Sequence, residues 1–335
     1  MIYLFRIAQT IREMKKVEQK YQGAAMTTVD KSALKKSNLF ETSKVKYFIR
    51  CMLAGMFLTL GTSIAVMVAE KAEHMLPGSG KFFYSFMFAW SLVMINYMNT
   101  ELGTSNMMYM TAAVYRKVLA PKRALAILFA CILFNLIGGA VASFVMSFTN
   151  IFQDLPAEHF LFHAVEGKLL KTPVQMVAEG IFANVIVNTT VFVSAHMKDD
   201  AGKLYSTIFI IFIFAFLGFE HVIANFSSFS LAFFAFGGAL PGMTVGSVLT
   251  NWFFAMIGNY IGGGLIIGLL YSWMNKGSEV YVDSRLWKPN WVPLKTRRIR
   301  KDGSFSFFLL RIKYSPNQIM FVFWGRMLAP TDDKP

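Results

Sequence analysis

Charged side chains are scarce in this sequence of 335 residues: 16% of its residues are charged, whereas 55% are hydrophobic. Soluble domains typically carry about 25% charged residues. The apolar residues also come in long blocks with the charges between them, and the mean hydropathy is +0.47. This pattern excludes an ordinary soluble domain and indicates a protein that crosses a membrane several times.

Acidic residues and cysteines are also few. With 19 acidic against 33 basic residues, the formal net charge is +14. The basic residues lie in the two tails and in short loops rather than along one folded face, which argues against nucleic-acid binding. Both cysteines, Cys51 and Cys131, lie inside apolar blocks without CxxC spacing, which argues against a disulfide framework or a zinc site. No nucleophile–base pair, metal-ligand spacing or phosphate loop predicts an enzyme, and no cofactor is implied.

Six apolar blocks are long enough to cross a bilayer, for which a helix needs about 20 mostly apolar residues. Short loops rich in lysine and arginine stay in the cytoplasm. Such loops follow the second and fourth blocks, and both tails are basic, so we expect both termini to be cytoplasmic. The predicted organisation is a basic N-terminal segment (1–46), a six-helix transport domain (47–274) and a basic C-terminal tail (275–335). The blocks cover residues 47–68, 82–115, 124–148, 173–194, 205–236 and 245–273.

Two of these blocks are interrupted by polar residues, at 99–106 and at 218–225. Unwound backbone is tolerated at membrane depth only where it is buried in protein or lines a cavity. The interrupted blocks are the second and the fifth of six, which is the arrangement of a three-plus-three inverted repeat with its binding site where the breaks meet. The two halves share no obvious residue identity, so hydropathy alone carries this expectation.

The second interruption holds an ionisable pair, Glu220 and His221, followed by Asn225. Ionisable residues inside a membrane are costly and commonly functional. Histidine changes charge close to physiological pH, so it can exchange a proton with a passing weak acid. The structural alternative is a neutral histidine that bonds one helix to another.

The first interruption holds hydroxyl and amide groups: Thr104, Ser105 and Asn106. A hydroxyl here can hydrogen-bond the imidazole or an anion. The same residues also serve as helix caps. Both roles are compatible, because a broken helix presents backbone N–H groups that attract anions.

Four sequence pieces together resemble the formate/nitrite transporter family: ELGTSN (101–106), GIFANVIVN (180–188), GFEHVIAN (218–225) and GNYIGGG (258–264). The resemblance covers about residues 40–275. It implies an all-α membrane protein with six transmembrane helices per protomer and an aquaporin-like inverted repeat whose second and fifth helices are broken. It also implies a homopentamer with one pore through each protomer.

The resemblance assigns roles residue by residue. The pore histidine is His221, the loop threonine that contacts it is Thr104, and the vestibule lysine is Lys168, with Lys171 as a nearby competitor. Further polar positions are Asn184, Glu220, Asn225 and Asn259, the hydrophobic constrictions are Phe88, Leu92, Leu102 and Phe214, and the gate loop contains Gly103, Ser105 and Asn106.

The family often carries phenylalanine directly before the loop threonine, where this chain has Gly103. Glycine has no side chain and frees the backbone. We therefore expect a wider or looser gate on the cytoplasmic side.

The predicted function is transport of a small monovalent anion, formate first, across the lipid bilayer, with proton coupling at the central histidine. A nitrite or hydrosulfide channel is the alternative. A membrane scaffold that does not transport and a water or glycerol pore are more remote, because a scaffold has no need of His221 at membrane depth and no Asn-Pro-Ala pair occurs.

Overall fold

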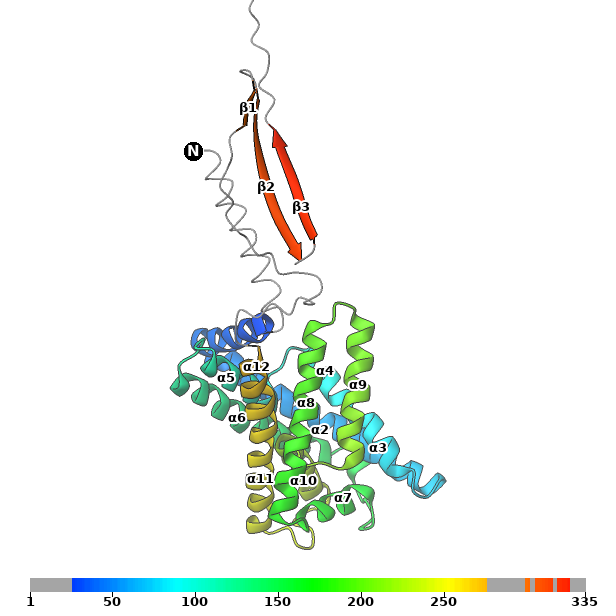
Figure 1. Ribbon diagram of the computed structural model, residues 1–335. Helices are drawn as coiled ribbons and strands as arrows, with labels where there is room; N and C mark the ends of the chain where they lie inside the picture. The colour runs from blue at the N-terminus through cyan, green and yellow to red at the C-terminus, as the bar shows by residue number, and fades with distance from the viewer. Residues whose placement is uncertain (1–25, 276–298, 302–304, 316–317, 326–335) are drawn as a thin grey trace, which may run out of the picture. The chain divides into compact units, whose positions relative to one another are not determined.

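The structure, a computed structural model, describes residues 26–275 and the backbone of residues 299–301, 305–315 and 318–325 (Figure 1). The chain divides into two compact units. One comprises residues Gly23–Gly277, and the other combines Met1–Gln22 with Ser278–Pro335. Much of the predicted N-terminal segment and most of the predicted C-terminal tail lie outside the described residues.

All the regular elements of the first unit within residues 26–275 are helices. The last three elements of this unit form one continuous helical rod. In chain order the elements are a helix over residues 26–42, α2 (Lys44–Met75), α3 (Gly80–Phe88), α4 (Trp90–Tyr97), α5 (Gly103–Tyr115), α6 (Pro121–Ser147), the 3₁₀ turn η1 (Asn150–Phe152), α7 (Phe160–Leu169), α8 (Pro173–His196), α9 (Asp200–Leu217), α10 (Val222–Ala235), α11 (Val245–Asn259), the π-helical η2 (Tyr260–Leu270) and α12 (Tyr271–Met274).

Local sequence signals set several of these helix ends. Thr172 caps α8 in a capping box with Gln175, and Pro173 occupies the first turn, where its missing N–H costs nothing. The α9 helix ends at Gly218, whose φ of 73° lies in the left-handed region that glycine adopts without strain. The chain is therefore free to turn sharply just before the ionisable pair.

Five described helices are long and apolar enough to cross a membrane, which makes this a multi-pass membrane protein. They match five of the six predicted blocks, the fifth block through its first half only. These helices are Lys44–Met75, Pro121–Ser147, Pro173–His196, Asp200–Leu217 and the rod Val245–Met274.

The two interrupted blocks are each divided among shorter helices. The second block holds α3, α4 and α5, and residues 98–102 between α4 and α5 are not helical. In the fifth block, residues 218–221 separate α9 from α10. We call residues 98–102 the first break and residues 218–221 the second break.

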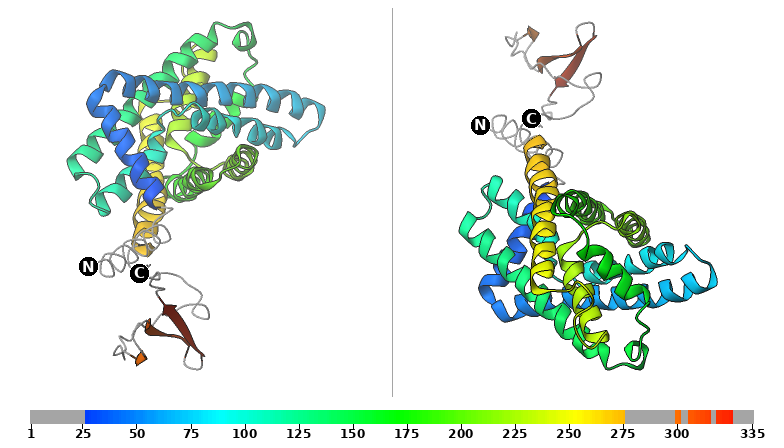
Figure 2. Two further views of the ribbon diagram at one scale, coloured as in Figure 1. Left: turned by 90° about the horizontal axis from the view of Figure 1, so that it is seen from above. Right: turned by 90° about the horizontal axis from the view of Figure 1, so that it is seen from below.

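The long helices pack in two tight pairs, α2 with α6 and α8 with α11. Glycines allow this close approach: a Cβ at Gly138 would collide with the Met52 carbonyl oxygen, and one at Gly258 would collide with that of Val177. The helices that follow the breaks cross over, since α5 packs on η2 and α10 packs on α6. Figure 2 views α8 and α9 nearly end on and side by side, whereas α2 is seen along its length and crosses them at a wide angle.

The helix over residues 26–42 is tied to the rest of this unit by ion pairs. Asp30 lies 2.8 Å from Arg116 at the end of α5, and Glu41 lies 2.7 Å from Arg123 at the start of α6. Part of the predicted N-terminal segment thus belongs to the helical unit.

The second unit contains an antiparallel three-stranded sheet, in the order β1 (Ile299–Lys301), β2 (Phe305–Ser315) and β3 (Gln318–Gly325). The all-α expectation therefore holds for residues 26–275 but not for the tail. The two long strands lie in apolar stretches of the tail, and they flank Pro-Asn at positions 316–317, which is a turn signal in the sequence.

Candidate functional site

A buried contact joins His221, in the second break, to Thr104, which lies just after the first break. Thr104 Oγ1 lies 2.7 Å from His221 Nε2, and both side chains are buried. Thr104 stands in the first turn of α5, and His221 caps α10 by accepting the Ala224 N–H at Nδ1 over 3.1 Å. Because Nδ1 accepts a hydrogen bond, the neutral ring carries its proton on Nε2 and donates it to Thr104.

The backbone of Thr104 is held from α8. Asn184 and Asn188 each donate a side-chain N–H to the Thr104 carbonyl oxygen over 3.2 Å. Asn188 was not among the predicted site residues, although its spacing of four from Asn184 in GIFANVIVN places both on one helix face.

All four predicted constriction residues are buried in one apolar cluster. The Phe214 ring lies 5.7 Å from the His221 ring and 5.9 Å from the Phe88 ring, measured between centroids. Leu92 and Leu102 belong to the same cluster. The imidazole is thus surrounded on one side by apolar side chains that offer no solvation to an ion.

Next to the histidine, the fully buried Glu220 carboxylate binds four side chains. Its Oε1 accepts from Lys168 at 2.9 Å and from Lys171 at 2.7 Å. Its Oε2 accepts from Asn225 at 2.5 Å and from Asn251 at 3.1 Å. Both candidate vestibule lysines therefore share one carboxylate oxygen, and Asn251 is a partner that sequence reasoning did not find.

The charge of Lys171 is stabilised where it lies, between α7 and α8. Burial alone would lower the pKa of Lys171, but Glu220 and Glu179 beside it more than offset this effect and raise the pKa above its ordinary value. The ammonium group is therefore charged at any physiological pH.

Asn259 of α11 fixes the backbone of the second break. Its Oδ1 accepts the Val222 N–H over 2.8 Å. Its Nδ2 donates to the carbonyl oxygens of Glu220 and Gly180, each over 2.9 Å. One buried amide thus satisfies backbone groups that the interrupted helix leaves without partners.

Asn135 of α6 does the same for the first break. Its Oδ1 accepts the Gly103 N–H over 2.7 Å, and its Nδ2 donates to the carbonyl oxygens of Glu101 and Cys51 over 2.8 and 2.7 Å.

The carboxylate of Glu101 completes the likeness between the breaks. It lies 2.6 Å from the ammonium nitrogen of Lys36 and accepts from Asn106 over 3.2 Å, as Glu220 accepts from Lys168 and Asn225. Asn106 stands five positions after Glu101, and Asn225 stands five positions after Glu220.

The sequence contained a signal for this correspondence. Asn135-Leu-Ile-Gly-Gly and Asn259-Tyr-Ile-Gly-Gly occupy matching places in the third and sixth blocks. We compared the two halves by hydropathy, which does not detect a match of single residues, and therefore missed this identity. For the same reason we did not predict that Lys36 and Asn135 contact the first break.

Gly103 does not leave the open space that we expected. A Cβ at this position would lie 2.9 Å from Ile132 Cγ1 and 3.1 Å from Asn135 Oδ1, so the position faces the packed surface of α6. Its N–H is held by Asn135. The missing side chain is thus compensated by close packing, which constrains this part of the gate loop rather than loosening it.

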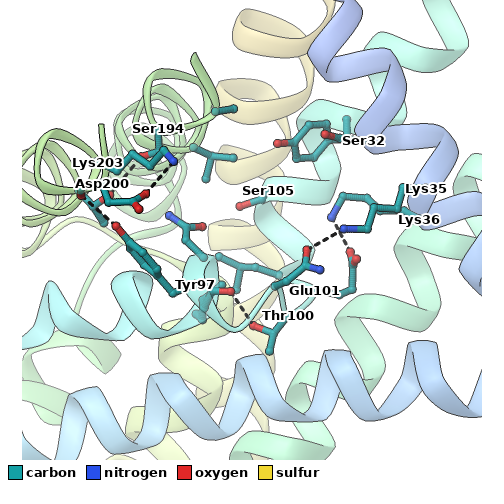
Figure 3. A pocket seen from close by; sticks show the side chains of 18 residues that line it. Ser32, Lys35, Lys36, Tyr97, Thr100, Glu101, Ser105, Ser194, Asp200 and Lys203 are labelled. Atoms are coloured by element: carbon teal, nitrogen blue, oxygen red, sulfur yellow. Dashed lines mark hydrogen bonds and ion pairs between the residues drawn. The ribbon is translucent and has the colours of Figure 1, made fainter. Parts of the chain in front are cut away.

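A cavity of about 490 Å³ lies beside the first break (Figure 3). The residues that line it include three lysines, Lys35, Lys36 and Lys203. Leu102 and Ser105 line it as well. Ser105 Oγ is buried and has no hydrogen-bond partner among the described residues, and the same holds for Asn96 Nδ2, another lining group. Glu101 and Asp200 also line the cavity and pair with Lys36 and Lys203, so the cavity combines these ion pairs with polar groups that are open to a ligand or to water.

Comparison with known proteins places this arrangement among transporters. The relatives include the uncharacterized transporter YwcJ of Bacillus subtilis (strain 168), 27% identical over 255 residues that cover 75% of this chain and 97% of that protein. The formate-nitrite transporter of Plasmodium falciparum (isolate 3D7) is 27% identical over 242 residues, covering 68% and 77%. The formate channel FocB of Escherichia coli (strain K12) is 28% identical over 254 residues, covering 68% and 86%.

Solved structures have the same fold. An FNT family ion channel superposes with a TM-score of 0.68 at 20% identity, covering 75% of this chain and all of that one. A pentameric formate channel with formate bound superposes with a TM-score of 0.59 at 22% identity, covering 70% and 98%. The formate/nitrite transporter family model matches residues 23–273. On this match and the shared fold, the chain belongs to the formate/nitrite transporter family.

Proposed function

We propose that this protein carries a small monovalent anion, formate first, across the membrane, with a proton shared at His221. The observation that carries the proposal is the 2.7 Å contact between Thr104, just after the first break, and His221, in the second break, which are 117 residues apart in the sequence. The names of the relatives, which include a formate channel and formate-nitrite transporters, support the choice of substrate.

The charges at the breaks account for anion capture. Lys168 on one side and Lys36 on the other present ammonium groups to an approaching anion, and each is held in place by a buried glutamate. Ser105 Oγ, at the border of the cavity, offers a hydroxyl hydrogen to an anion that enters there.

The apolar cluster accounts for proton coupling. Moving a bare anion past Phe88, Phe214 and Leu102 is costly, because these side chains replace none of its hydration. A proton shared through His221 neutralises the anion for this step, so that it passes as the uncharged weak acid. A second proton on the ring has to occupy Nδ1, which removes the acceptor of the Ala224 N–H, so the charged ring is disfavoured.

The overall assembly belongs to the same proposal. The matched bonds of Asn135 and Asn259 support six transmembrane helices in an inverted repeat, with breaks in the second and fifth. The basic loops support a cytoplasmic position for both termini, with residues 1–46 before and residues 275–335 after the transport domain 47–274 in the sequence. The homopentamer is proposed from the pentameric formate channel of the same fold.

The test is uptake of labelled formate into liposomes that contain the purified protein, at acid and at neutral pH, with nitrite as competitor. We expect fast entry that rises at acid pH and is weakly inhibited by nitrite. His221→Phe should abolish the proton-coupled flux, and His163→Phe, which changes an exposed histidine on α7, should not. Unchanged flux and pH dependence in His221→Phe would contradict the mechanism, whereas a voltage-driven nitrite current without formate entry would favour the nitrite channel.

A further inference from the structure

The two breaks differ in the number of lysines on their glutamates. Among the described residues, Glu101 pairs with one lysine, Lys36, whereas Glu220 pairs with Lys168 and with Lys171. Both of the latter reach the same oxygen, Oε1. The extra lysine breaks an otherwise matched pattern.

The two lysines on Glu220 are held very differently. An ammonium group has three N–H donors. Lys171 uses one on Glu179 at 2.5 Å, one on the Gly218 carbonyl at 2.9 Å and one on Glu220 at 2.7 Å. Lys168 uses one, on Glu220, and the described part of the chain gives its ammonium group no second acceptor. Lys171 is therefore fixed, and Lys168 keeps two donors available to a ligand.

The buried carboxylate determines what Lys168 can do. Glu220 is fully buried, and a buried charge without a partner is strongly destabilising. If Lys168 were its one cationic partner, turning toward an anion would leave Glu220 without a counter-charge. With Lys171 in place the carboxylate stays paired, and the two ammonium groups on one oxygen also repel each other, which weakens the hold on Lys168.

We propose that Lys171 is a positioning residue that holds the charge of Glu220, so that Lys168 can leave this carboxylate and bind the incoming anion. The proposal rests on the proposed anion transport and goes beyond it, because it assigns different tasks to the two lysines. Lys168 contacts the anion. Lys171 acts through Glu220.

The first test measures formate uptake into liposomes as a function of formate concentration. Lys171→Ala should raise the half-saturating concentration roughly fivefold and leave the maximal rate nearly unchanged. Lys171→Arg should largely restore the wild-type value, because it keeps the charge. Lys71→Ala removes one exposed lysine from the end of α2 and serves as the matched control without an effect.

A double-mutant cycle separates positioning from simple attraction. If Lys171 acts through the charge of Glu220, Lys171→Ala causes no further rise in a Glu220→Gln background, in which no carboxylate needs a counter-charge. An equal rise in both backgrounds means that Lys171 attracts the anion independently, which overturns the proposal. An unchanged half-saturating concentration in the single variant overturns it as well.

A second test does not depend on transport. The rate at which an acetylating reagent modifies Lys168 is measured by mass spectrometry on the purified protein. In Lys171→Ala we expect this rate to fall roughly threefold, because Lys168 is then the remaining partner of Glu220. An unchanged or faster reaction overturns the proposal. If the wild type carries no formate, the proposed function fails, and the acetylation rate still decides the role of Lys171.

Discussion

Removing the buried amide of Asn259 should destabilise the protein by about 2–6 kcal/mol. In Asn259→Ala, the Val222 N–H and the Glu220 carbonyl lose a partner. Both lie outside the hydrogen-bond ladder of a helix, and each buried group left unpaired costs about 1–3 kcal/mol. The Gly180 carbonyl lies within α8, so we add no cost for it.

The corresponding change on the other half, Asn135→Ala, strips the Gly103 N–H and the Glu101 carbonyl in the same way. We therefore expect a loss of the same size. Denaturant titration in mixed micelles, followed by tryptophan fluorescence, measures both values against the exposed control Asn150→Ala. A large loss in one variant and less than about 0.5 kcal/mol in the other, a size typical of surface substitutions, would refute the equivalence of the two breaks.

Three further predictions follow from the same contacts. Gly103→Phe should cost about 1–3 kcal/mol of stability, because the new side chain meets Ile132 and Asn135, and the same titration measures it. Lys36→Ala should cost about 3 kcal/mol by leaving Glu101 buried and unpaired, and adding Glu101→Gln should recover part of that loss. The rise of formate flux from neutral to acid pH should persist in Lys171→Ala: the pKa of Lys171 is raised above the ordinary 10.5, so its charge is constant in this range and is lost only at far higher pH. A flat pH profile of liposome uptake in this variant would contradict that reasoning.

Much of the helical unit was predictable because a bilayer imposes its thickness on apolar segments. The contact between Thr104 and His221 was expected from the family resemblance, and polar residues inside apolar blocks located both breaks. The shared carboxylate was not predictable, because Lys168 and Lys171 are separated by a helix end whose direction the sequence does not specify.

Other features depended on directions that a pattern of residues does not contain. Gly103 was expected to open the gate loop, yet its missing side chain points at α6. The strands of the tail were not predicted, because the tail was described by its basic charge and lies outside the family resemblance that carried the all-α expectation.

The glycine contacts between α2 and α6 and between α8 and α11 bear on how the protein can move. Backbones that touch at Gly138 and Gly258 cannot slide or rotate without lifting apart, so each pair behaves as one rigid body. Large rocking motions within a pair are therefore disfavoured, and a conformational change has to take place between the pairs or in the breaks. The helix pairs thus form a stiff scaffold, and the short non-helical breaks are the part of it that can rearrange at the least cost in packing.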